Sequence, residues 1–427
     1  MPAGQTPVPG QTGMRVVVIG GGVVGVTTAW ELASRGLHVT LLESQPGFGL
    51  GASGDNGAQL SYSYVTPLAQ PGLLASLPGL LFGRDAALTL RLRWSMAQWA
   101  WCARFAMACT AKRACDTTTA LLALARASRV ALHELLADQP FDIDHARHGK
   151  LVLYRSEGTW RAAQRQVQLQ AELGCQQQLL DRAQCVALEP ALASSAHGLV
   201  GGVYTPDEES GDCRRFVEQL GAHLSARAVV HVGSGDATPV LRQGRLVAVQ
   251  TPGRRFEADA FVLAAGVGSR AFARQAGIDL PLLGLKGYST TLALTNAAVA
   301  PRVSITDSER RVVYARVDGQ LRVAGFVEIG ARDATPSPRA SRHLHACAAA
   351  LFPGLIQPQT APRTWAGLRP ATPTGLPIIG STPIPGLWVN VGHGALGWTL
   401  ACGSARLLSQ RLLGEPGVVD AMPYGFK

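Results

Sequence analysis

The hydrophobic pattern at the start of the chain predicts a parallel β–α–β unit. The run RVVVI (15–19) is short, apolar and rich in β-branched residues, which is typical of a strand buried on both faces. Helical spacing follows over 23–35 and ends at Gly36, where glycine suits a helix C-terminus. A second apolar run, HVTLL (38–42), is closed by Glu43.

The middle of the chain mixes helical and strand patterns. Helices are predicted at 117–138 and 156–174, and strands at 150–154 and 201–206. We expect three further segments to be strands of the first sheet: 226–233, 244–251 and 254–266.

The last third of the chain changes to antiparallel patterning. Strands are predicted at 287–294, 310–317 and 320–329. Asp318-Gly319 lies between the last two and predicts a hairpin turn. Residues 386–413 then predict a strand, a glycine-rich loop and a helix that ends at Gly414.

Residues 66–110 predict a loop followed by a helix with Trp94, Trp101 and Phe105 at helical spacing among arginines. Two interpretations stay open: a helix that packs its aromatic side chains inward, or an amphipathic face that lies on a membrane. No stretch of about 18 residues is continuously apolar, so we expect no transmembrane helix.

The length and the order of elements predict two interleaved domains of an α/β protein, because 427 residues are many for one core. We predict a Rossmann-like cofactor-binding domain with an inserted α+β substrate domain. Residues 1–13 have neither the basic nor the apolar segment of a targeting peptide and are expected to be a flexible leader. The cofactor-binding domain is expected to comprise 14–65, 196–275 and 362–427, and the substrate domain 66–195 and 276–361.

The net charge of +10 comes almost wholly from arginine. The arginines are scattered and only 6% of residues are aromatic, so we predict no nucleic-acid partner. A positive potential still suits an anionic cofactor, a carboxylate substrate or a phospholipid surface. The eight cysteines and ten histidines show no CxxC or HExxH spacing, so we predict no metal site and thiols in a reducing cytoplasm.

A glycine motif joins the first strand to the first helix. Gly20, Gly22 and Gly25 form G-x-G-x-x-G, and Glu43 ends the second strand 23 residues after Gly20. These glycines allow a tight turn, a close approach to a pyrophosphate and close packing of helix on strand, and the acid can accept hydrogen bonds from a ribose. The motif alone predicts FAD or NAD(P).

The rest of the sequence favours FAD. A second motif, with Gly266, Gly268 and Ala271, has no acid at the end of a following strand, so we predict one dinucleotide. We expect Gly266 where a returning strand passes close to it. GASGDNGAQLSYSY (51–64) is dense in small and polar residues that can wrap a long cofactor with backbone N–H groups.

One arginine stands alone in an apolar segment. In WAGLRPATPTGLPIIG (365–380), Arg369 has no acidic residue within eight positions on either side. A buried guanidinium without a partner is costly, so Arg369 either reaches solvent or binds an anion.

From about Met14 to Leu413 the chain resembles the D-amino-acid dehydrogenases, within the wider FAD-dependent oxidoreductases that include D-amino-acid oxidase and glycine oxidase. The resemblance rests on VVGVTTAWEL (23–32), DEESGDC (207–213), LKGYS (285–289), WAGLRPATPTGLPIIG and VGHGALGWTLACGSARLLS. After AQLS the dehydrogenases show Pro-Gly before a tyrosine. Here Tyr62-Ser63-Tyr64 stands instead, which leaves the substrate range open.

The resemblance implies a D-amino-acid oxidase-like fold with non-covalent FAD and a β-sheet substrate domain over the flavin. It also implies oxidative deamination of D-amino acids by hydride transfer from Cα to flavin N5. The implied electron acceptor is respiratory, a quinone or a partner protein. The implied location is the cytoplasm, with peripheral attachment to the inner face of a bacterial inner membrane as an option.

The site residues follow from motif and resemblance together. The catalytic candidates are Arg369 for the substrate carboxylate, and Tyr64, Tyr288, Tyr314 and His393 near the pocket. The cofactor-binding candidates are Gly20, Gly22, Val23, Val24, Gly25, Glu43, Ser44, Asn56, Gly57, Ala58, Gln59, Ala265, Gly266, Lys286, Gly392, Gly394, Leu396, Gly397, Trp398 and Thr399.

Two alternatives to D-amino-acid dehydrogenation remain open. One is an oxidase or dehydrogenase of glycine, sarcosine or a cyclic D-imino acid such as D-hydroxyproline. The other is a non-catalytic flavin subunit that transfers electrons.

Overall fold

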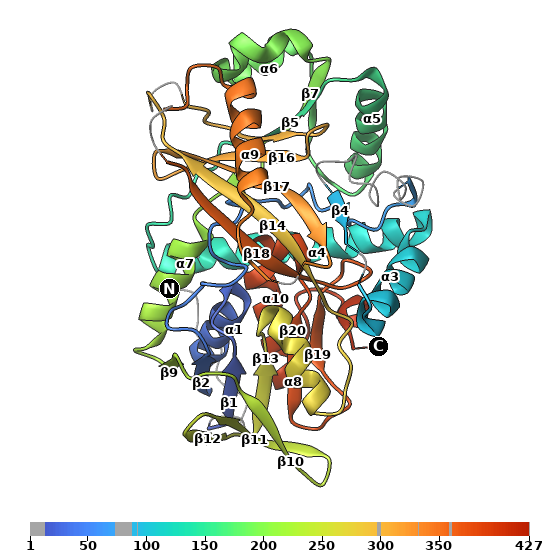
Figure 1. Cartoon of the computed structure of the whole chain (residues 1–427). Coiled ribbons are helices and arrows are strands. Elements are labelled where there is room, and N and C mark those ends of the chain that lie inside the picture. Colours follow the sequence, from blue (N-terminus) through green and yellow to red (C-terminus); the bar gives the residue numbers. More distant parts are fainter. Residues whose placement is uncertain are drawn as a thin grey trace.

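The computed structural model describes residues 13–72, 88–91, 93–296, 300–331, 333–357 and 361–426. Apart from Gly13, the predicted leader lies outside these residues, and so does 73–87 of the predicted loop. Two large β-sheets organise the described chain, one in the lower half of Figure 1 and one in the upper half.

The lower sheet has six strands and contains the predicted β–α–β unit. Neighbouring strands are parallel except for one antiparallel edge pair. From that edge the order is β19 (Ile378–Ser381), β20 (Leu387–Val391), β13 (Ala260–Leu263), β1 (Arg15–Ile19), β2 (His38–Glu43) and β9 (Val229–Val232).

Helices cover one face of the lower sheet. The helix of the predicted unit, α1 (Val23–Ser34), has apolar or small residues on nearly every side, so it can be buried between the sheet and other helices. Those helices are α4 (Ala111–Asp138), α7 (Cys213–Leu224) and α10 (Gly397–Leu413).

The other face carries α8 (Ser269–Gln275) and a small antiparallel sheet of β10 (Thr238–Arg242), β11 (Arg245–Thr251) and β12 (Arg254–Glu257). We expected 244–251 and 254–257 in the first sheet, and this prediction was wrong. The turns Gln243-Gly244 and Pro252-Gly253 are two residues long, so these strands pair with their sequence neighbours.

The upper sheet has nine strands and contains the predicted antiparallel segments. The hairpin at Asp318-Gly319 is confirmed, with positive φ at both residues. The order is β18 (Arg363–Ala371), β14 (Leu283–Leu292), β17 (Gln320–Ile329), β16 (Val312–Val317), β15 (Ser304–Asp307), β5 (Lys150–Tyr154), β7 (Gly201–Thr205) and β6 (Gln178–Leu180), with β4 (Leu88–Leu90) beside β17.

Two segments lie in a different sheet from the one that we expected. Both β7 and β18 were placed with the cofactor-binding part, yet they pair in the upper sheet, β18 along nearly the whole length of β14. Our division into two domains remains an interpretation. Judged by strand pairing, the chain passes from the upper to the lower sheet for the last time after Ala371.

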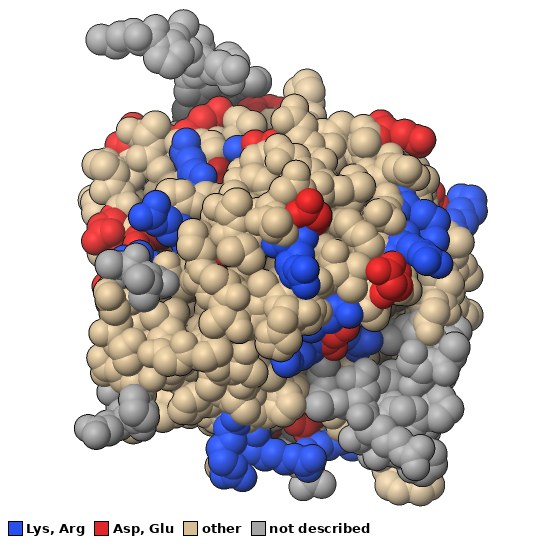
Figure 2. All heavy atoms as spheres, turned by 90° about the horizontal axis from the view of Figure 1, so that it is seen from above, with Lys and Arg blue, Asp and Glu red and all other residues tan. Residues whose placement is uncertain are grey.

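The upper sheet is covered on its outer face by α9 (Pro338–Leu351), which packs on β14 and β17. Around its rim lie α5 (Glu157–Glu172), α6 (Arg182–Leu188) and the 3₁₀ helix Pro190–Gly198. A short pair, β3 (Gln59–Leu60) and β8 (Glu209–Ser210), lies outside both large sheets. Seen from above, the described charged side chains form scattered mixed groups (Figure 2).

The helix that we predicted near Trp101 is α3 (Met96–Ala108), and it packs one aromatic side chain fully inward. Trp101 is buried and donates a hydrogen bond from Nε1 to the carbonyl of Ala371 (2.9 Å). Trp94, just before the helix, and Met96, Trp99 and Met107 on it are exposed. Within the described ranges, none of the helices has both the length and the apolar character needed to cross a bilayer.

We predict that Gly25→Ala disrupts the β–α–β unit. A Cβ on Gly25 would lie 1.7 Å from the carbonyl oxygen of Gly20, so helix and strand would have to separate. Overpacking of this kind costs about 1–3 kcal/mol, and we expect a lower melting temperature and poorer cofactor retention. The control is Gly158→Ala in α5, where a Cβ meets nothing within 4 Å and stability should hold. Equal melting temperatures for the two variants would contradict the prediction.

Candidate active site

A cavity of about 940 Å³ is lined by residues of both large sheets. Its walls come from the glycine motif after β1, the segment after β2, the inner face of the upper sheet and the loop before α10. Sites for small ligands usually measure about 300–1,000 Å³, so this cavity is large enough for an extended ligand.

The structure brings most of the predicted site residues together here. Arg369, His393 and Tyr64 line the cavity. So do the predicted cofactor-binding residues Gly20, Gly22, Val23, Val24, Glu43, Ser44, Asn56, Gly57, Ala58, Gln59, Ala265, Gly266, Gly392, Gly394, Leu396, Gly397, Trp398 and Thr399. Their roles in binding remain predictions.

The glycine motif lies at one end of the cavity. At Gly20, with φ of 115°, a Cβ would lie 2.6 Å from the carbonyl oxygen of Ala264 in the neighbouring loop. Gly22 is the N-cap of α1 and provides no side-chain cap. The N–H of Val23 donates to Ser53 Oγ (2.9 Å). The start of this helix therefore faces the cavity with the positive end of its dipole, which favours phosphate.

Glu43 lies beside that helix end and is already held by the backbone. Its Oε2 accepts from the N–H of Gly21 (2.5 Å), and its Oε1 accepts from the N–H of Gln45 (2.7 Å). Oε1 also accepts a weak hydrogen bond from Ser44 Oγ (3.4 Å). Oε2 can accept a further hydrogen bond, so Glu43 can also bind a ribose hydroxyl.

Residues 52–64, which we call the crossing segment, pass across the inner face of the upper sheet strand by strand. The side chain of Ser289 in β14 donates to the carbonyl of Asp55. Arg322 in β17 donates to the carbonyl of Asn56 (3.1 Å). Further along, Gln59 donates to the carbonyl of Ile305 in β15 (3.4 Å), and Lys150 in β5 donates to Ser61 Oγ (3.0 Å).

An ion pair inside the protein fixes the first half of this segment. The side chain of Arg322 is 2% exposed, and its Nη2 lies 3.3 Å from Asp55 Oδ1. It also donates from Nε to Thr291 Oγ1 (2.6 Å). Arg363 donates to Asp55 from the other side (2.9 Å). Because every charge here has a partner, the segment can be buried without an unpaired ion.

Arg369 differs from Arg322 in having no such partner. Among the described residues it has neither an ion pair nor a hydrogen bond, and burial lowers the pKa of its guanidinium. Its side chain lies over Gly287 of β14, where a Cβ would come within 2.6 Å of Arg369 Cζ. Gly287 therefore provides the space in which the guanidinium lies at the cavity wall.

His393 lies in the loop before α10, whose first turn has no side-chain cap. Burial lowers the pKa of His393 to about 3, so its imidazole is neutral at physiological pH. Its Nε2 is 3.1 Å from Ser404 Oγ. The N-terminal N–H groups of α10 can stabilise negative charge in the cavity. Because His393 is neutral, it adds no positive charge of its own there.

Tyr288, Tyr314 and Lys286 do not line the cavity, contrary to our expectation. Side chains alternate between the faces of a strand, so Tyr288 and Lys286 lie on the face of β14 opposite to Gly287. Tyr288 donates to Glu328 (2.7 Å), and Lys286 lies 3.5 Å from Asp333. Tyr314 is buried against Phe352 in the core under α9.

Gly25 is also absent from the lining, because its role is the close packing of α1 on the loop after β1.

Sequence reasoning missed two buried ionisable residues. Lys150 lines the cavity, 4.2 Å above the ring of Tyr64, and burial lowers its pKa to about 8. Glu208 accepts from the N–H groups of Ser63 (2.7 Å) and Tyr64 (3.0 Å), and burial raises its pKa. The sequence signal that could have revealed Lys150 is its position at the start of an apolar strand.

The lining fits the dinucleotide that the sequence predicts. Two helix starts whose N-cap residues provide no side-chain hydrogen bond face one cavity, and Glu43 lies beside the first of them. At Gly266, with φ of 57°, a Cβ would meet nothing within 4 Å, so a side chain there would fill space that a ligand can use. Phosphates suit the first helix start, and an electron-accepting ring suits the second.

Comparison with known proteins agrees with this geometry. The profile of a family described as FAD dependent oxidoreductase matches residues 15–411. A protein named D-amino acid dehydrogenase 2 from Ralstonia nicotianae is 42% identical over 96% of this chain and 99% of its own length. A D-amino acid dehydrogenase from Paramagnetospirillum magneticum is 40% identical over 95% of this chain and 97% of its own length.

The fold is similar to that of solved flavoenzymes. The structure of glycine oxidase from Geobacillus kaustophilus matches with a TM-score of 0.74 at 20% identity, over 97% of this chain and 99% of that one. At this identity the likeness concerns the fold, and it confirms the predicted α/β fold class.

We predict that Tyr314→Phe leaves KM and kcat within about twofold of wild type, since Tyr314 lies away from the cavity and its hydroxyl has no hydrogen-bond partner among the described residues. Stability should be unchanged or slightly higher. Tyr288→Phe is the matched variant, and we expect it to lose about 1 kcal/mol with its bond to Glu328. A tenfold rise in KM for Tyr314→Phe would return this residue to the site.

Proposed function

We propose that this chain, which belongs to the family of FAD-dependent oxidoreductases, oxidises D-amino acids to 2-oxo acids and ammonia. The observation that carries the proposal is Arg369, a partly buried guanidinium at the cavity wall without an acidic partner among the described residues. A guanidinium can bind a carboxylate through two parallel hydrogen bonds and so fix its orientation. The D-configuration is supported by the names of the similar dehydrogenases.

The residues that would hold FAD are those already described. The start of α1 would bind the pyrophosphate, Glu43 a ribose, and residues 56–59 with the start of α10 the flavin ring. When bound, FAD supplies a two-electron acceptor for the hydride that leaves the substrate Cα.

The atoms and electrons of the reaction balance with the amino acid, FAD and water alone. The amine loses a proton, the Cα–H bond breaks and a C=N bond forms. Water adds to the resulting imino acid and releases ammonia, which leaves the 2-oxo acid. Arg369 would hold the carboxylate so that the Cα–H bond is correctly oriented, and positioning of this kind can contribute several kcal/mol. His393 is neutral and close to Ser404, so we assign it no proton transfer.

We further propose a respiratory electron acceptor, a quinone or a partner protein, and a location in the cytoplasm or on the inner face of a bacterial inner membrane. Two observations support this. The similar proteins are named dehydrogenases. Trp94, Met96, Trp99 and Met107 expose apolar side chains on α3 and just before it, which suits contact with a lipid surface.

We expect Arg369→Ala to raise KM for D-alanine by about a hundredfold, since one charge-assisted contact contributes about 1.5–3 kcal/mol. Arg369→Lys should recover only part of this loss. FAD content should remain at the wild-type level in both variants. The control is Arg316→Ala, because Arg316 is exposed on the outer part of β16. Unchanged kinetics in Arg369→Ala would remove this residue from the substrate site.

Anaerobic mixing with single amino acids tests the substrate class. We expect D-amino acids to bleach the visible absorbance of the bound flavin and L-amino acids not to do so. With a good substrate, turnover with a quinone analogue should exceed turnover with oxygen. Bleaching by glycine, sarcosine or cyclic imino acids alone would favour the oxidase or dehydrogenase of those substrates. A flavin that no amino acid bleaches would indicate an electron-transfer subunit.

A further inference from the structure

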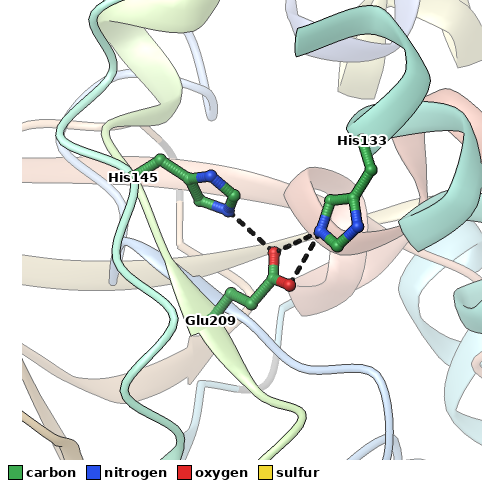
Figure 3. Close-up of side chains that lie close together, drawn as sticks. All are labelled: His133, His145 and Glu209. Carbon is green, nitrogen blue, oxygen red and sulfur yellow. Dashed lines mark hydrogen bonds and ion pairs between the residues drawn. The ribbon is translucent and has the colours of Figure 1, made fainter. Parts of the chain in front are cut away.

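A second polar centre lies outside the cavity, around Glu209 of β8. Its carboxylate is 1% exposed, and two imidazoles point at it from separate parts of the chain (Figure 3). His133 Nε2, from α4, lies 2.8 Å from Oε1 and 3.0 Å from Oε2. His145 Nε2, from the loop after α4, lies 2.8 Å from Oε2.

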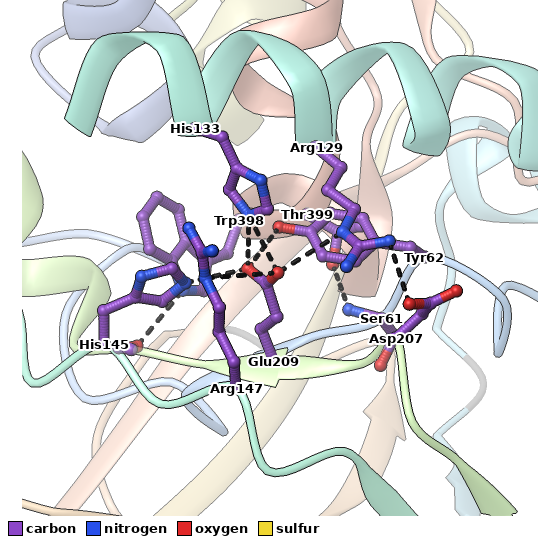
Figure 4. A network of polar contacts seen from close by, with 11 residues as sticks. Ser61, Tyr62, Arg129, His133, His145, Arg147, Asp207, Glu209, Trp398 and Thr399 are labelled. Carbon is purple, nitrogen blue, oxygen red and sulfur yellow. Dashed lines mark hydrogen bonds and ion pairs between the residues drawn. The ribbon is translucent and has the colours of Figure 1, made fainter. Parts of the chain in front are cut away.

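The two carboxylate oxygens of Glu209 have different surroundings (Figure 4). The guanidinium groups approach Oε1, with Arg129 Nε at 3.3 Å and Arg147 Nε at 3.9 Å. Oε2 faces both imidazoles and accepts a weak hydrogen bond from the hydroxyl of Tyr62 (3.4 Å). Oε1 is therefore shared between the arginines and His133, whereas Oε2 faces both imidazoles.

The imidazole side of this centre has the donor set of a zinc site. The two Nε2 atoms and the carboxylate oxygens all lie within 4.8 Å of one another. The rings are 5.9 Å apart and inclined at 59°, so their nitrogens converge from different directions. Zinc bonds to nitrogen and oxygen measure about 2.0–2.2 Å, so tetrahedral ligand atoms lie about 3.4 Å apart. The distances of 2.8 Å from each Nε2 to its nearer carboxylate oxygen would therefore have to lengthen by about 0.5 Å.

We propose that His133, His145 and Glu209 form a binding site for Zn²⁺. The histidine side chains are 26% and 16% exposed, which allows an ion to enter and leaves room for water as a fourth ligand. The three residues are far apart in the sequence, which is why the spacing of histidines alone predicted no metal site.

The positive charge around Glu209 opposes the binding of a cation. However, the side chain of Arg147 is 59% exposed and can turn away, and Arg129 is also paired with Asp207 (3.3 Å). A contact such as that of Arg129 with Oε1 typically orients a metal-binding carboxylate.

The site would be structural, because none of its three residues lines the cavity. The ion would join α4, the loop after it and β8. Since Glu209 pairs with Leu60 in β3, it would also support the crossing segment at the cavity wall.

Calorimetric titration of the FAD-containing full chain with Zn²⁺, after treatment with a chelator, tests the proposal. We expect one ion per chain. At zinc 100-fold above Kd, the melting temperature should rise by about 3 °C. Failure of the chelator-treated protein to take up micromolar zinc would overturn the proposal.

Variants separate this site from other histidines. His145→Gln can still donate to Glu209 but lacks the imidazole ligand, so we expect at least a tenfold loss of zinc affinity with normal FAD content. His133→Gln should behave in the same way. The control is His223→Gln, an exposed histidine of α7 whose Nδ1 lies 2.9 Å from the carbonyl of Gln219. Equal zinc affinity in wild type and both site variants, or an equal loss in the control, would show that the zinc binds elsewhere.

Discussion

The ion pair between Arg322 and Asp55 is the interaction on which the architecture of the cavity depends. A segment that crosses the interior without joining a large sheet must find partners for its polar backbone groups. The upper sheet provides them from β14, β17, β15 and β5 in turn, and the Arg322–Asp55 pair fixes the first of these contacts. Removal of Asp55 would leave the buried Arg322 without its ion-pair partner, a change that typically costs about 3–5 kcal/mol.

Side chains alternate between the two faces of β14 and β18. This alternation places the side chains of the cavity wall on one face of the sheet and those of the core under α9 on the other. One face of β14 carries Gly287 and gives Arg369 of β18 its place at the cavity wall. The other face carries Tyr288, which belongs to the core under α9. Arg322 and Arg369 are both largely buried arginines on the inner face of this sheet. The first is neutralised within the protein, whereas the second has no acidic partner among the described residues, and this difference distinguishes a structural charge from a binding one.

The sequence predicted most of what depends on local pattern. The glycine motif, the first helix, the hairpin at Asp318-Gly319 and the unpaired Arg369 were all recognisable because each depends on neighbouring residues. The faces of β14 and β16 were not, since period-two alternation does not say which face is the core, and so Tyr288 and Tyr314 were misplaced. The pairing of β18 and the meeting of His133, His145 and Glu209 depend on contacts between distant segments, which residue spacing does not encode.

The cavity is lined by segments from both ends of the chain, and this order affects folding during synthesis. One wall begins at Gly20 and another ends at Thr399, near the start of the last long helix. The central strand β1 pairs with β13, more than two hundred residues later in the chain. During synthesis the β–α–β unit therefore has an exposed sheet edge until β13 has been made, and the pocket is not yet closed. Capture of the cofactor becomes a late event, after the final helix has left the ribosome, and an incomplete chain is exposed to aggregation until then.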